Sequence, residues 1–244
     1  MTMYFDLFSD ENLPEHLKAY LQKAESPLDY LNHLPQLLKS LLNGQSILGT
    51  VEPGAQIMGD VYIGKDTIIH SNVVIEGPVY IGEGVSVRPH ANIRHGAYLG
   101  DKCVIGHSAD VKNTLALRGT KIQDGTFAGD SVLGQDARVG SGAILANRKF
   151  NQSNIKISFA ENGEVIDTQR DFFGAIMGDQ SRVCENVITS PGTVIGQHTW
   201  VGSGAVLHGY YGPNQLITVK QDLEIQPKEK VNLKAGKAIT FDYL

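Results

Sequence analysis

The sequence predicts a mainly β protein built as a parallel β-helix of hexapeptide repeats, with a short helical segment before it. An aliphatic residue recurs at every sixth position, and a small or β-branched residue follows four positions after it. The composition agrees, because 27 glycines can serve the corners while aromatic residues make up only 7% of the chain. A period of six is neither helical nor a simple strand alternation, and three such rungs complete one triangular coil.

The first 46 residues differ from the rest of the chain. Between positions 12 and 43, leucines and tyrosines recur at helical spacing and predict two short amphipathic helices. Pro14 and Pro27 lie where a first helical turn tolerates proline, and Pro35 is expected to kink or divide the second segment. This helical hairpin is expected to cap an end of the solenoid, with docking of a partner as the alternative.

The repeat region is assigned to residues 47–208. Its aliphatic positions run regularly through Val51, Ile57, Ile63, Ile69, Ile75, Ile81, Val87, Ile93, Leu99, Ile105 and Val111. These side chains are predicted to point inward and to stack on their counterparts one coil away, while glycine permits the turns.

The regular spacing breaks between positions 114 and 134. A series through Val111, Ala116, Ile122, Ala128 and Leu133 explains this stretch, with two rungs of five residues instead of six. The solenoid therefore continues, but its corners change there. Irregular corners are places where binding surfaces form.

A second interruption, over residues 147–173, predicts an excursion loop. Alternating strands flank Asn162-Gly163, which is a strong hairpin signal. The six-residue series resumes from Met177 to Leu207, and residues 209–244 are assigned to C-terminal strands and a tail, through "QLITVK" and "KVNLKAGKAITFDYL".

Charge and composition limit the possible functions. The formal charge of −5 argues against a nucleic-acid binder or a membrane-surface protein, and no apolar run reaches the length of a membrane span. The two cysteines, Cys103 and Cys184, form no CxxC pair, which suits a reducing compartment. We therefore expect a cytoplasmic protein.

Binding sites are expected on the faces and between copies, because stacked aliphatic residues fill the interior. A flat-sided prism favours a homotrimer. Cations after the inward positions, such as Arg88 and Lys112, can bind an anion, although scattered solvated charge is an equal alternative. The stretch "VIGHSADVK" resembles the start of the zinc-site pattern of γ-class carbonic anhydrases, with His107 at its first histidine. That resemblance implies a second histidine five residues later, where Lys112 stands, so zinc is disfavoured and no metal is predicted.

The chain resembles a known family. The stretch from "IEGPVYIGEGVSVRPHANIRHGAYLGDKCVIGHSADVKNT" through "FAGDSVLGQDARVGSGAILANRKF" is similar to the C-terminal half of bifunctional sugar-1-phosphate nucleotidyltransferase/glucosamine-1-phosphate N-acetyltransferases. The similarity covers residues 47–208 and includes "FGAIMGDQSRVCENVITSPGTVIG". The resemblance, and not the period, implies a left-handed β-helix and acetyl-CoA as co-substrate. The glycine-rich loop of the nucleotidyltransferase half does not occur.

The resemblance also assigns site residues. Arg88 in "VRP" and Lys112 in "VKNT" match positions that hold the sugar phosphate, and Asn147 matches a position that contacts substrate or cofactor. Ser141 and Ser203, each in "VGSG", match small positions along the acetyl-CoA channel. Two cations facing a phosphate are electrostatically reasonable.

One departure affects the expected chemistry. In "DGTFAGD", Asp124 stands where the family has its histidine base, and Phe127 stands at the position of a tyrosine near the substrate. A carboxylate is a weaker base than an imidazole. The leading hypothesis remains an acetyltransferase acting on an amino-sugar phosphate in nucleotide-sugar biosynthesis, with Asp124 orienting or deprotonating the amine.

Two alternatives stay open. One is a catalytically silent trimeric subunit that binds a sugar phosphate or acts as a scaffold for a separate nucleotidyltransferase. The weaker one is a hydratase like the γ-class carbonic anhydrases.

Overall fold

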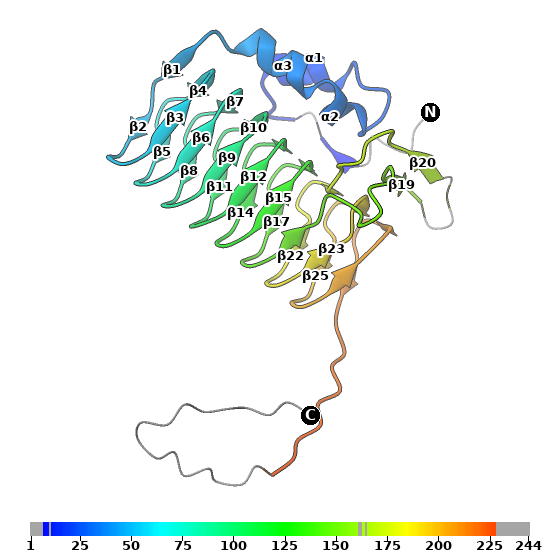
Figure 1. The fold of residues 1–244 in the computed structure, drawn as a ribbon. Helices are drawn as coiled ribbons and strands as arrows, with labels where there is room; N and C mark the ends of the chain where they lie inside the picture. The colour runs from blue at the N-terminus through cyan, green and yellow to red at the C-terminus, as the bar shows by residue number, and fades with distance from the viewer. Residues whose placement is uncertain (1–6, 10, 161–162, 164, 228–244) are drawn as a thin grey trace, which may run out of the picture.

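A computed structural model describes residues 7–9, 11–160, 163 and 165–227. It shows the predicted mainly β fold, a left-handed parallel β-helix in which the chain passes in turn through three sheets (Figure 1). We name them sheets A, B and C in the order in which the chain first meets them. The strands predicted within "KVNLKAGKAITFDYL" lie outside the described residues.

Sheet A forms the face that also carries the helices. Its strands, in spatial order, are β1 (Gln45–Ile47), β4 (Val61–Ile63), β7 (Val79–Ile81), β10 (Ala97–Leu99), β13 (Leu115–Ala116), β16 (Val132–Leu133), β21 (Ala175–Met177), β24 (Thr193–Ile195) and β27 (Tyr210–Tyr211).

Sheet B follows sheet A within each coil. Its strands are β2 (Thr50–Val51), β5 (Ile68–Ile69), β8 (Ser86–Val87), β11 (Val104–Ile105), β14 (Lys121–Ile122), β17 (Arg138–Val139), β22 (Arg182–Val183), β25 (Trp200–Val201) and β28 (Leu216–Ile217).

Sheet C completes the coil. Its strands are β3 (Gln56–Met58), β6 (Val74–Glu76), β9 (Asn92–Arg94), β12 (Asp110–Lys112), β15 (Phe127–Gly129), β18 (Ile144–Leu145), β23 (Ile188–Thr189) and β26 (Val206–Leu207).

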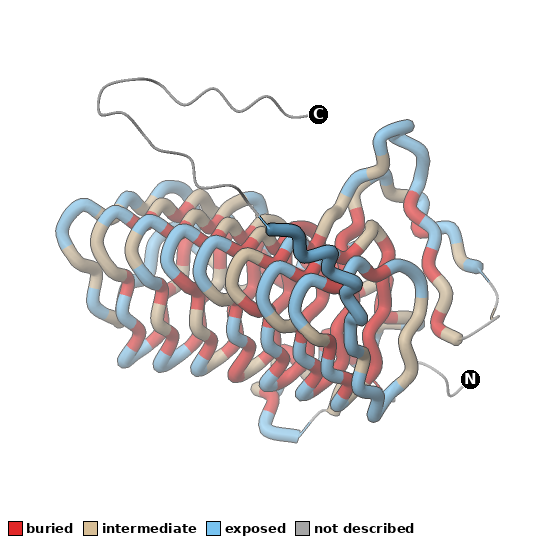
Figure 2. Tube along the Cα trace, turned by 90° about the horizontal axis from the view of Figure 1, so that it is seen from below, coloured by how far each residue is buried: buried red, intermediate tan, exposed pale blue. Residues whose placement is uncertain are grey.

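The core is the stack of inward residues, as the period predicted. Ile63, Ile81 and Leu99 pair on successive strands of sheet A, and each is fully buried. Along most coils buried residues alternate with exposed or half-buried ones (Figure 2). Burying a large aliphatic side chain contributes roughly 1.5–3 kcal/mol, so the stacked columns are the main source of stability.

The register confirms the two shortened rungs. Ile81 pairs with Leu99, 18 positions along the chain, whereas Leu99 pairs with Ala116 after only 17. The next coil, from Ala116 to Leu133, again takes 17. Both missing residues are lost between sheet C and sheet A, in the turns after β12 and β15. We call the corner formed by the turns from sheet C to sheet A the C–A edge.

The helical segment consists of α1 (Glu15–Leu21), α2 (Asp29–Asn32) and α3 (Leu34–Leu41). Pro35 lies in the first turn of α3, so the predicted division of the second segment is confirmed. The expectation of an end cap is wrong. The helices cover the outer face of sheet A, while Ile47 and Met58 in the first coil remain 42% and 43% exposed (Figure 1).

Outward side chains of sheet A explain this position, because they form a second apolar surface. Tyr62, Tyr80 and Tyr98 stack with ring centroids 4.8 and 4.7 Å apart. His16 of α1 packs against them, with its Nε2 atom 3.0 Å from the Tyr98 hydroxyl. Farther along the face Leu115 and other outward residues join the same cluster, so the helices bury a surface that would otherwise face water.

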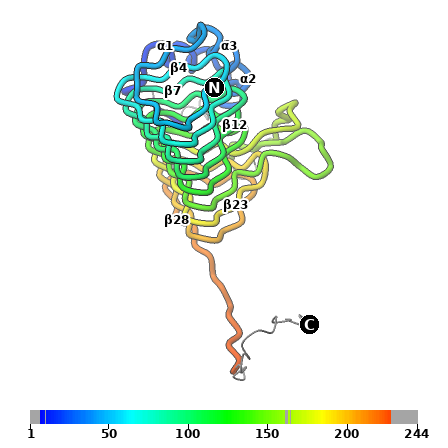
Figure 3. Tube along the Cα trace, turned by 60° about the vertical axis from the view of Figure 1, so that its left-hand side comes forward, coloured from blue at the N-terminus to red at the C-terminus, as the bar shows by residue number. Residues whose placement is uncertain are grey.

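The second interruption is a hairpin, as predicted. β19 (Lys156–Ser158) and β20 (Val165–Asp167) pair antiparallel, and the loop projects from the prism between β18 and β21 (Figure 3). Its base is closed by a bridge between Arg148 and Phe172. The excursion therefore leaves at the C–A edge, one coil after the shortened rungs.

Candidate functional site

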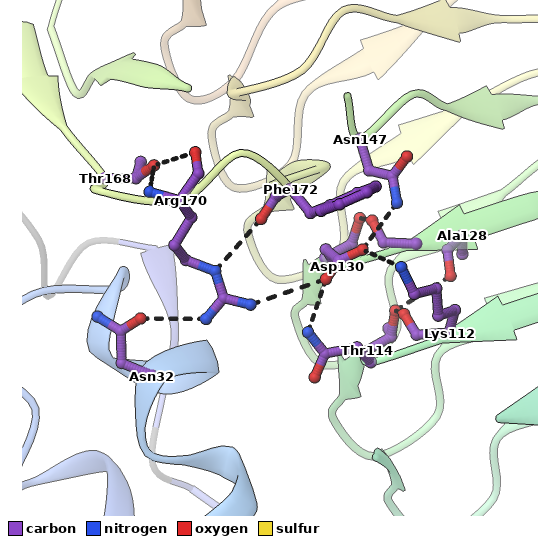
Figure 4. A network of polar contacts seen from close by, with 12 residues as sticks. Asn32, Lys112, Thr114, Ala128, Asp130, Asn147, Thr168, Arg170 and Phe172 are labelled. Carbon is purple, nitrogen blue, oxygen red and sulfur yellow. Dashed lines mark hydrogen bonds and ion pairs between the residues drawn. The ribbon is translucent and has the colours of Figure 1, made fainter. Parts of the chain in front are cut away.

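A buried carboxylate lies at the C–A edge, between the shortened rungs and the base of the excursion loop (Figure 4). Asp130 directly follows β15, and its side chain is only 3% exposed. Its φ of 49° is in the left-handed region, which aspartate tolerates better than most residues. Asn113 Nδ2 donates to Oδ1 and Asn147 Nδ2 to Oδ2, each at 2.7 Å. Both carboxylate oxygens are thus satisfied.

Two cations also approach this carboxylate, and they come from different segments. Lys112 Nζ lies 3.5 Å from Oδ2 of Asp130, and Arg170 Nη2 lies 3.7 Å from Oδ1. Arg170 also donates to the carbonyl of Phe172 at 3.2 Å and to Oδ1 of Asn32, in α2, at 3.1 Å. The guanidinium therefore ties the solenoid, the excursion loop and the helical segment together.

Two cations, one of them Lys112 again, lie over the ring of Phe172. Lys112 Nζ lies 4.4 Å and the Arg148 guanidinium 4.8 Å from its centroid. Lys112, Arg148 and Arg170 together bring three positive charges to a corner whose contacts include one carboxylate, that of Asp130. The surplus makes this corner suited to a multiply charged anion such as a phosphate.

Two more predicted residues join Lys112 at this corner. A Cβ at Gly129 would lie 2.6 Å from Phe127 Cζ and 2.7 Å from Asn147 Nδ2, so the Phe127 ring and the Asn147 amide lie directly over that glycine. The absence of a side chain at Gly129 allows both groups to approach the backbone. Lys112, Phe127 and Asn147 therefore lie together.

Asp124 lies elsewhere, in the turn from sheet B to sheet C, a corner that we call the B–C edge. Its Oδ1 accepts the backbone N–H of His107 at 2.8 Å and lies 4.0 Å from Arg88 Nη1. About half of each of the Arg88 and Asp124 side chains is exposed. The His107 ring packs edge-on against that of His90, at 5.5 Å between centroids. Asp124 is thus an accessible carboxylate beside the Arg88 cation and the His107 backbone.

The two serines lie along the B–C edge as well. Ser141 and Ser203 each follow an inward valine of sheet B by two positions, as Asp124 follows Ile122. Ser203 Oγ donates to Glu185 at 2.9 Å. The backbone N–H of Glu185 and, after it, this hydroxyl lower the pKa of the Glu185 carboxyl. The predicted cofactor residues and Asp124 therefore share one edge.

The predicted site is divided between the two edges of sheet C. Asp124 and Asp130 are six residues apart along one rung. Six extended residues span about 20 Å, so roughly 15–20 Å separates the edges once the corners are allowed for. Arg88 and Lys112, both assigned to the phosphate, are on opposite edges and do not meet within one chain.

The sequence did not identify Asp130, Arg170 or Phe172 as site residues. A signal for Asp130 was present, because it directly follows Gly129 in a shortened rung, next to the excursion loop. Arg170 gave no such signal, since its position over Asp130 depends on how the loop folds back.

No group of three or more histidine, cysteine, aspartate or glutamate side chains in the described ranges is arranged to hold a metal ion. Among the same residues, no helix is long and apolar enough to cross a membrane.

The fold and these corners define a left-handed β-helix protein of hexapeptide repeats. Residues 50–77 match the family "Bacterial transferase hexapeptide (six repeats)", and residues 75–188 match the family "GMPPB C-terminal domain". Among its relatives, the chain is 36% identical over 202 residues to a "Bifunctional sugar-1-phosphate nucleotidylyltransferase/acetyltransferase" of Sulfurisphaera tokodaii, covering 83% of this chain and 50% of the relative.

Other relatives carry the name "Bifunctional protein GlmU". That of Methanococcus maripaludis strain C7 is 34% identical over 212 residues, covering 87% of this chain and 50% of the relative. That of Methanococcus aeolicus is 28% identical over 214 residues, covering 88% and 51%. The chain is therefore homologous to the C-terminal half of GlmU-type bifunctional proteins. It spans about half the length of these relatives.

A solved UDP-N-acetylglucosamine acyltransferase from Francisella novicida is a more distant neighbour. It covers 67% of this chain and 62% of its own, with a TM-score of 0.49 and 16% identity. At that distance the likeness carries no functional argument.

Proposed function

We propose that this chain is the acetyltransferase part of a sugar-phosphate enzyme, which transfers an acetyl group from acetyl-CoA to an amino-sugar phosphate of the glucosamine-1-phosphate type. The observation that carries the proposal is the corner around Asp130, where Lys112 and Arg170 approach the carboxylate and Arg148 lies over the adjacent Phe172 ring. A phosphate dianion would balance the surplus charge of that corner. The name of the Sulfurisphaera tokodaii relative, a bifunctional sugar-1-phosphate nucleotidylyltransferase/acetyltransferase, supports the same reaction class.

The division of the site leads to the second part of the proposal, a homotrimer with shared sites. An amino sugar with its phosphate at Lys112 is too small to reach Asp124 across sheet C of the same chain. The B–C edge of a neighbouring copy would supply Asp124, Arg88 and the two serines. The phosphate group then binds one copy and the amine another.

An apolar column on sheet C supports contact between copies. Phe127, Ile144, Ile188 and Val206 pair in register and point outward, and the last three are 41%, 40% and 70% exposed. An apolar stripe of this kind on a sheet face is suited to burial against a second copy. Sedimentation as a monomer at micromolar concentration would rule out the trimer.

In the proposed reaction, the amine of the bound sugar attacks the thioester carbonyl of acetyl-CoA. The new C–N bond replaces the C–S bond, coenzyme A leaves as the thiol, and the amine loses one proton. Asp124 would bind the ammonium form, take up the proton that the attacking amine loses, directly or through water, and pass it on to the departing thiolate. The glycines that flank Ser141 and Ser203 leave room along the B–C edge for the pantetheine arm. Nothing in this scheme requires a covalent intermediate on the protein.

The test is acetyl-CoA-dependent thiol release with glucosamine-1-phosphate. Lys112→Gln should raise KM for the sugar phosphate at least tenfold, whereas Lys102→Gln, which removes another surface lysine, should change nothing. Sugar-phosphate-independent activity, or an unchanged KM in Lys112→Gln, would contradict the assignment of the phosphate.

The shared site has its own test. Asp124→Asn and Lys112→Gln proteins are mixed under conditions that exchange subunits. They are assayed at a sugar-phosphate concentration far below the raised KM of Lys112→Gln, where each protein alone has little activity. Mixed trimers contain intact sites, so part of the activity should return. No recovery in oligomers proven to be mixed would show that the two residues act within one chain.

A second candidate function is a catalytically silent trimer that binds a sugar phosphate or holds a separate nucleotidyltransferase. It is favoured by one observation, that a carboxylate in contact with Arg88 and the His107 backbone stands at the position of the family's base. An inactive wild type with an active Asp124→His variant would support it, as would co-purification with a nucleotidyltransferase without acetyl-CoA binding.

A further inference from the structure

Sheet B carries a ladder of cations that the proposed reaction does not use. Lys121, Arg138 and Arg182 are paired neighbours on three successive strands, β14, β17 and β22. All three are exposed and point outward, because the next residue on each strand is buried in the core. On the following strand Trp200 occupies the same position, and the Arg182 guanidinium lies 5.0 Å from the centroid of its ring.

This arrangement costs stability in the isolated chain. Adjacent strands are about 4.8 Å apart, and like charges directly opposite each other on neighbouring strands are destabilising. Within the described part of the chain, none of the three cations forms an ion pair with a carboxylate. A local conflict of this kind is typical of a functional surface.

A cavity of about 350 Å³ lies along the ladder. Its lining combines the three cations with turn residues of the A–B edge, the corner between sheets A and B: Gly119, Lys121, Asp136, Arg138, Gln180 and Arg182. Asp136 supplies one negative charge, and Glu185 acts electrostatically on Arg138 from the next coil. Gly119 brings no side chain into the space. The cavity therefore keeps a net positive charge in a chain whose overall charge is −5.

We propose that this ladder of Lys121, Arg138 and Arg182 is a binding site for two or more phosphates linked in a chain. The three cations extend over about 10 Å, which is two strand spacings and more than one phosphate group can contact. Guanidinium groups bind phosphate oxygens in pairs, and two of the three cations are arginines. The site lies on sheet B, away from the Asp130 corner, and does not depend on the acetyltransferase proposal.

The chain provides its own reporter for this site. Trp200 is its one tryptophan, so fluorescence excited at the long-wavelength edge, where tryptophan absorbs and tyrosine does not, reports on the end of the ladder alone. The probe is sodium tripolyphosphate, titrated at constant ionic strength into the full chain. A phosphate chain that draws Arg182 away from the Trp200 ring should produce a saturable change in fluorescence. Calorimetric titration measures the same binding independently of the tryptophan.

Two variants distinguish a site from general screening. Arg138→Gln should weaken tripolyphosphate binding at least tenfold by calorimetry, while Lys65→Gln, which removes an exposed lysine from an early coil, should leave it unchanged. Circular dichroism should show both variants folded. Orthophosphate should bind at least tenfold more weakly than tripolyphosphate.

Further probes identify the source of the phosphates. ADP and coenzyme A both carry a pyrophosphate, with different groups attached, and competition against tripolyphosphate ranks them. Tighter binding of either one than of inorganic pyrophosphate supports the proposal and names the ligand class. No saturable heat or fluorescence change, equal binding of orthophosphate, or an equal loss in Lys65→Gln would overturn it.

Discussion

The carboxylate of Asp130 is expected to anchor the excursion loop, and the change Asp130→Asn tests this. Asparagine fits the same space and tolerates the left-handed φ of 49°. It removes the negative charge, however, and turns one carboxylate oxygen into an NH₂ group that faces the amide NH₂ of Asn113 or Asn147. One hydrogen bond is therefore replaced by two NH₂ groups that face each other, and Lys112 and Arg170 lose the negative charge that they approach.

The size of the effect follows from these contacts. A hydrogen bond to a charged group contributes about 1.5–3 kcal/mol, and removing one partner of a buried ion pair costs about 3–5 kcal/mol. The side chains of Lys112 and Arg170 are 22% and 26% exposed, so water can partly solvate them after the carboxylate charge is lost. We therefore expect a loss of about 2–4 kcal/mol. For a chain of this length, 3 kcal/mol corresponds to a fall in Tm of about 6–12 °C.

Two measurements test the expected loss of stability in Asp130→Asn. Scanning calorimetry gives the change in Tm, and limited trypsin digestion gives the exposure of the loop, whose cleavage sites are Arg148, Lys149, Lys156 and Arg170. Asp136→Asn is the matched control, because Asp136 also has a left-handed φ, of 54°, but is exposed and holds no ion pair among the described residues. Equal Tm and equal cleavage rates in the two variants would refute the role of Asp130 as the anchor.

Three further predictions concern buried or half-buried polar groups. Burial raises the pKa of Asp179 to about 6 from 3.8, so between these values the folded chain holds a proton that the unfolded chain has released. The free energy of unfolding should therefore fall as pH rises from about 4 to 6. Denaturant titrations at several pH values should show that this fall is smaller in Asp179→Asn. Burial lowers the pKa of His16 below its ordinary 6.5, so the contact of α1 with sheet A should weaken as pH falls below 6.5. Amide exchange in residues 15–41, corrected for its intrinsic rate, should then accelerate on acidification, and less so in His16→Gln than in the wild type. The buried Oγ1 of Thr189 has no hydrogen-bond partner among the described residues, so Thr189→Val should stabilise the chain by about 1 kcal/mol, measured by urea unfolding. Thr193→Val is the control, because it removes a 2.7 Å hydrogen bond to the Ser190 carbonyl and should destabilise the chain.

The repeat region was predictable because its physics is local. Each inward residue is specified by its own hexapeptide, and one coil repeats the contacts of the last. The paired series Ile81, Leu99, Ala116 and Leu133 therefore follows from counting alone, including the two rungs of five residues. The hairpin strands around position 162 were equally local, since they are set by alternation and a turn.

Contacts between distant segments were not predictable in this way. The helical segment covers sheet A because Tyr80, Tyr98 and Leu115 point outward there, but an alternating pattern in a repeat does not say which outward face is covered. Arg170 reaches Asp130 only because the loop returns across the edge and α2 supplies Asn32 to hold it. Resemblance located single residues, but it could not show that Arg88 and Lys112 lie on different edges.

The shortened rungs explain why the candidate site forms at this corner. A regular turn of sheet C into sheet A uses one residue more than the turns after Lys112 and Gly129. Removing that residue tightens two successive turns, and the second of them carries Asp130, which is buried, in its left-handed conformation. A buried carboxylate needs donors, and the adjacent turn and the excursion loop supply them through Asn113, Asn147 and Arg170. The break in the repeat therefore creates the acceptor around which the cations gather, and the excess of those cations is what a phosphate would neutralise.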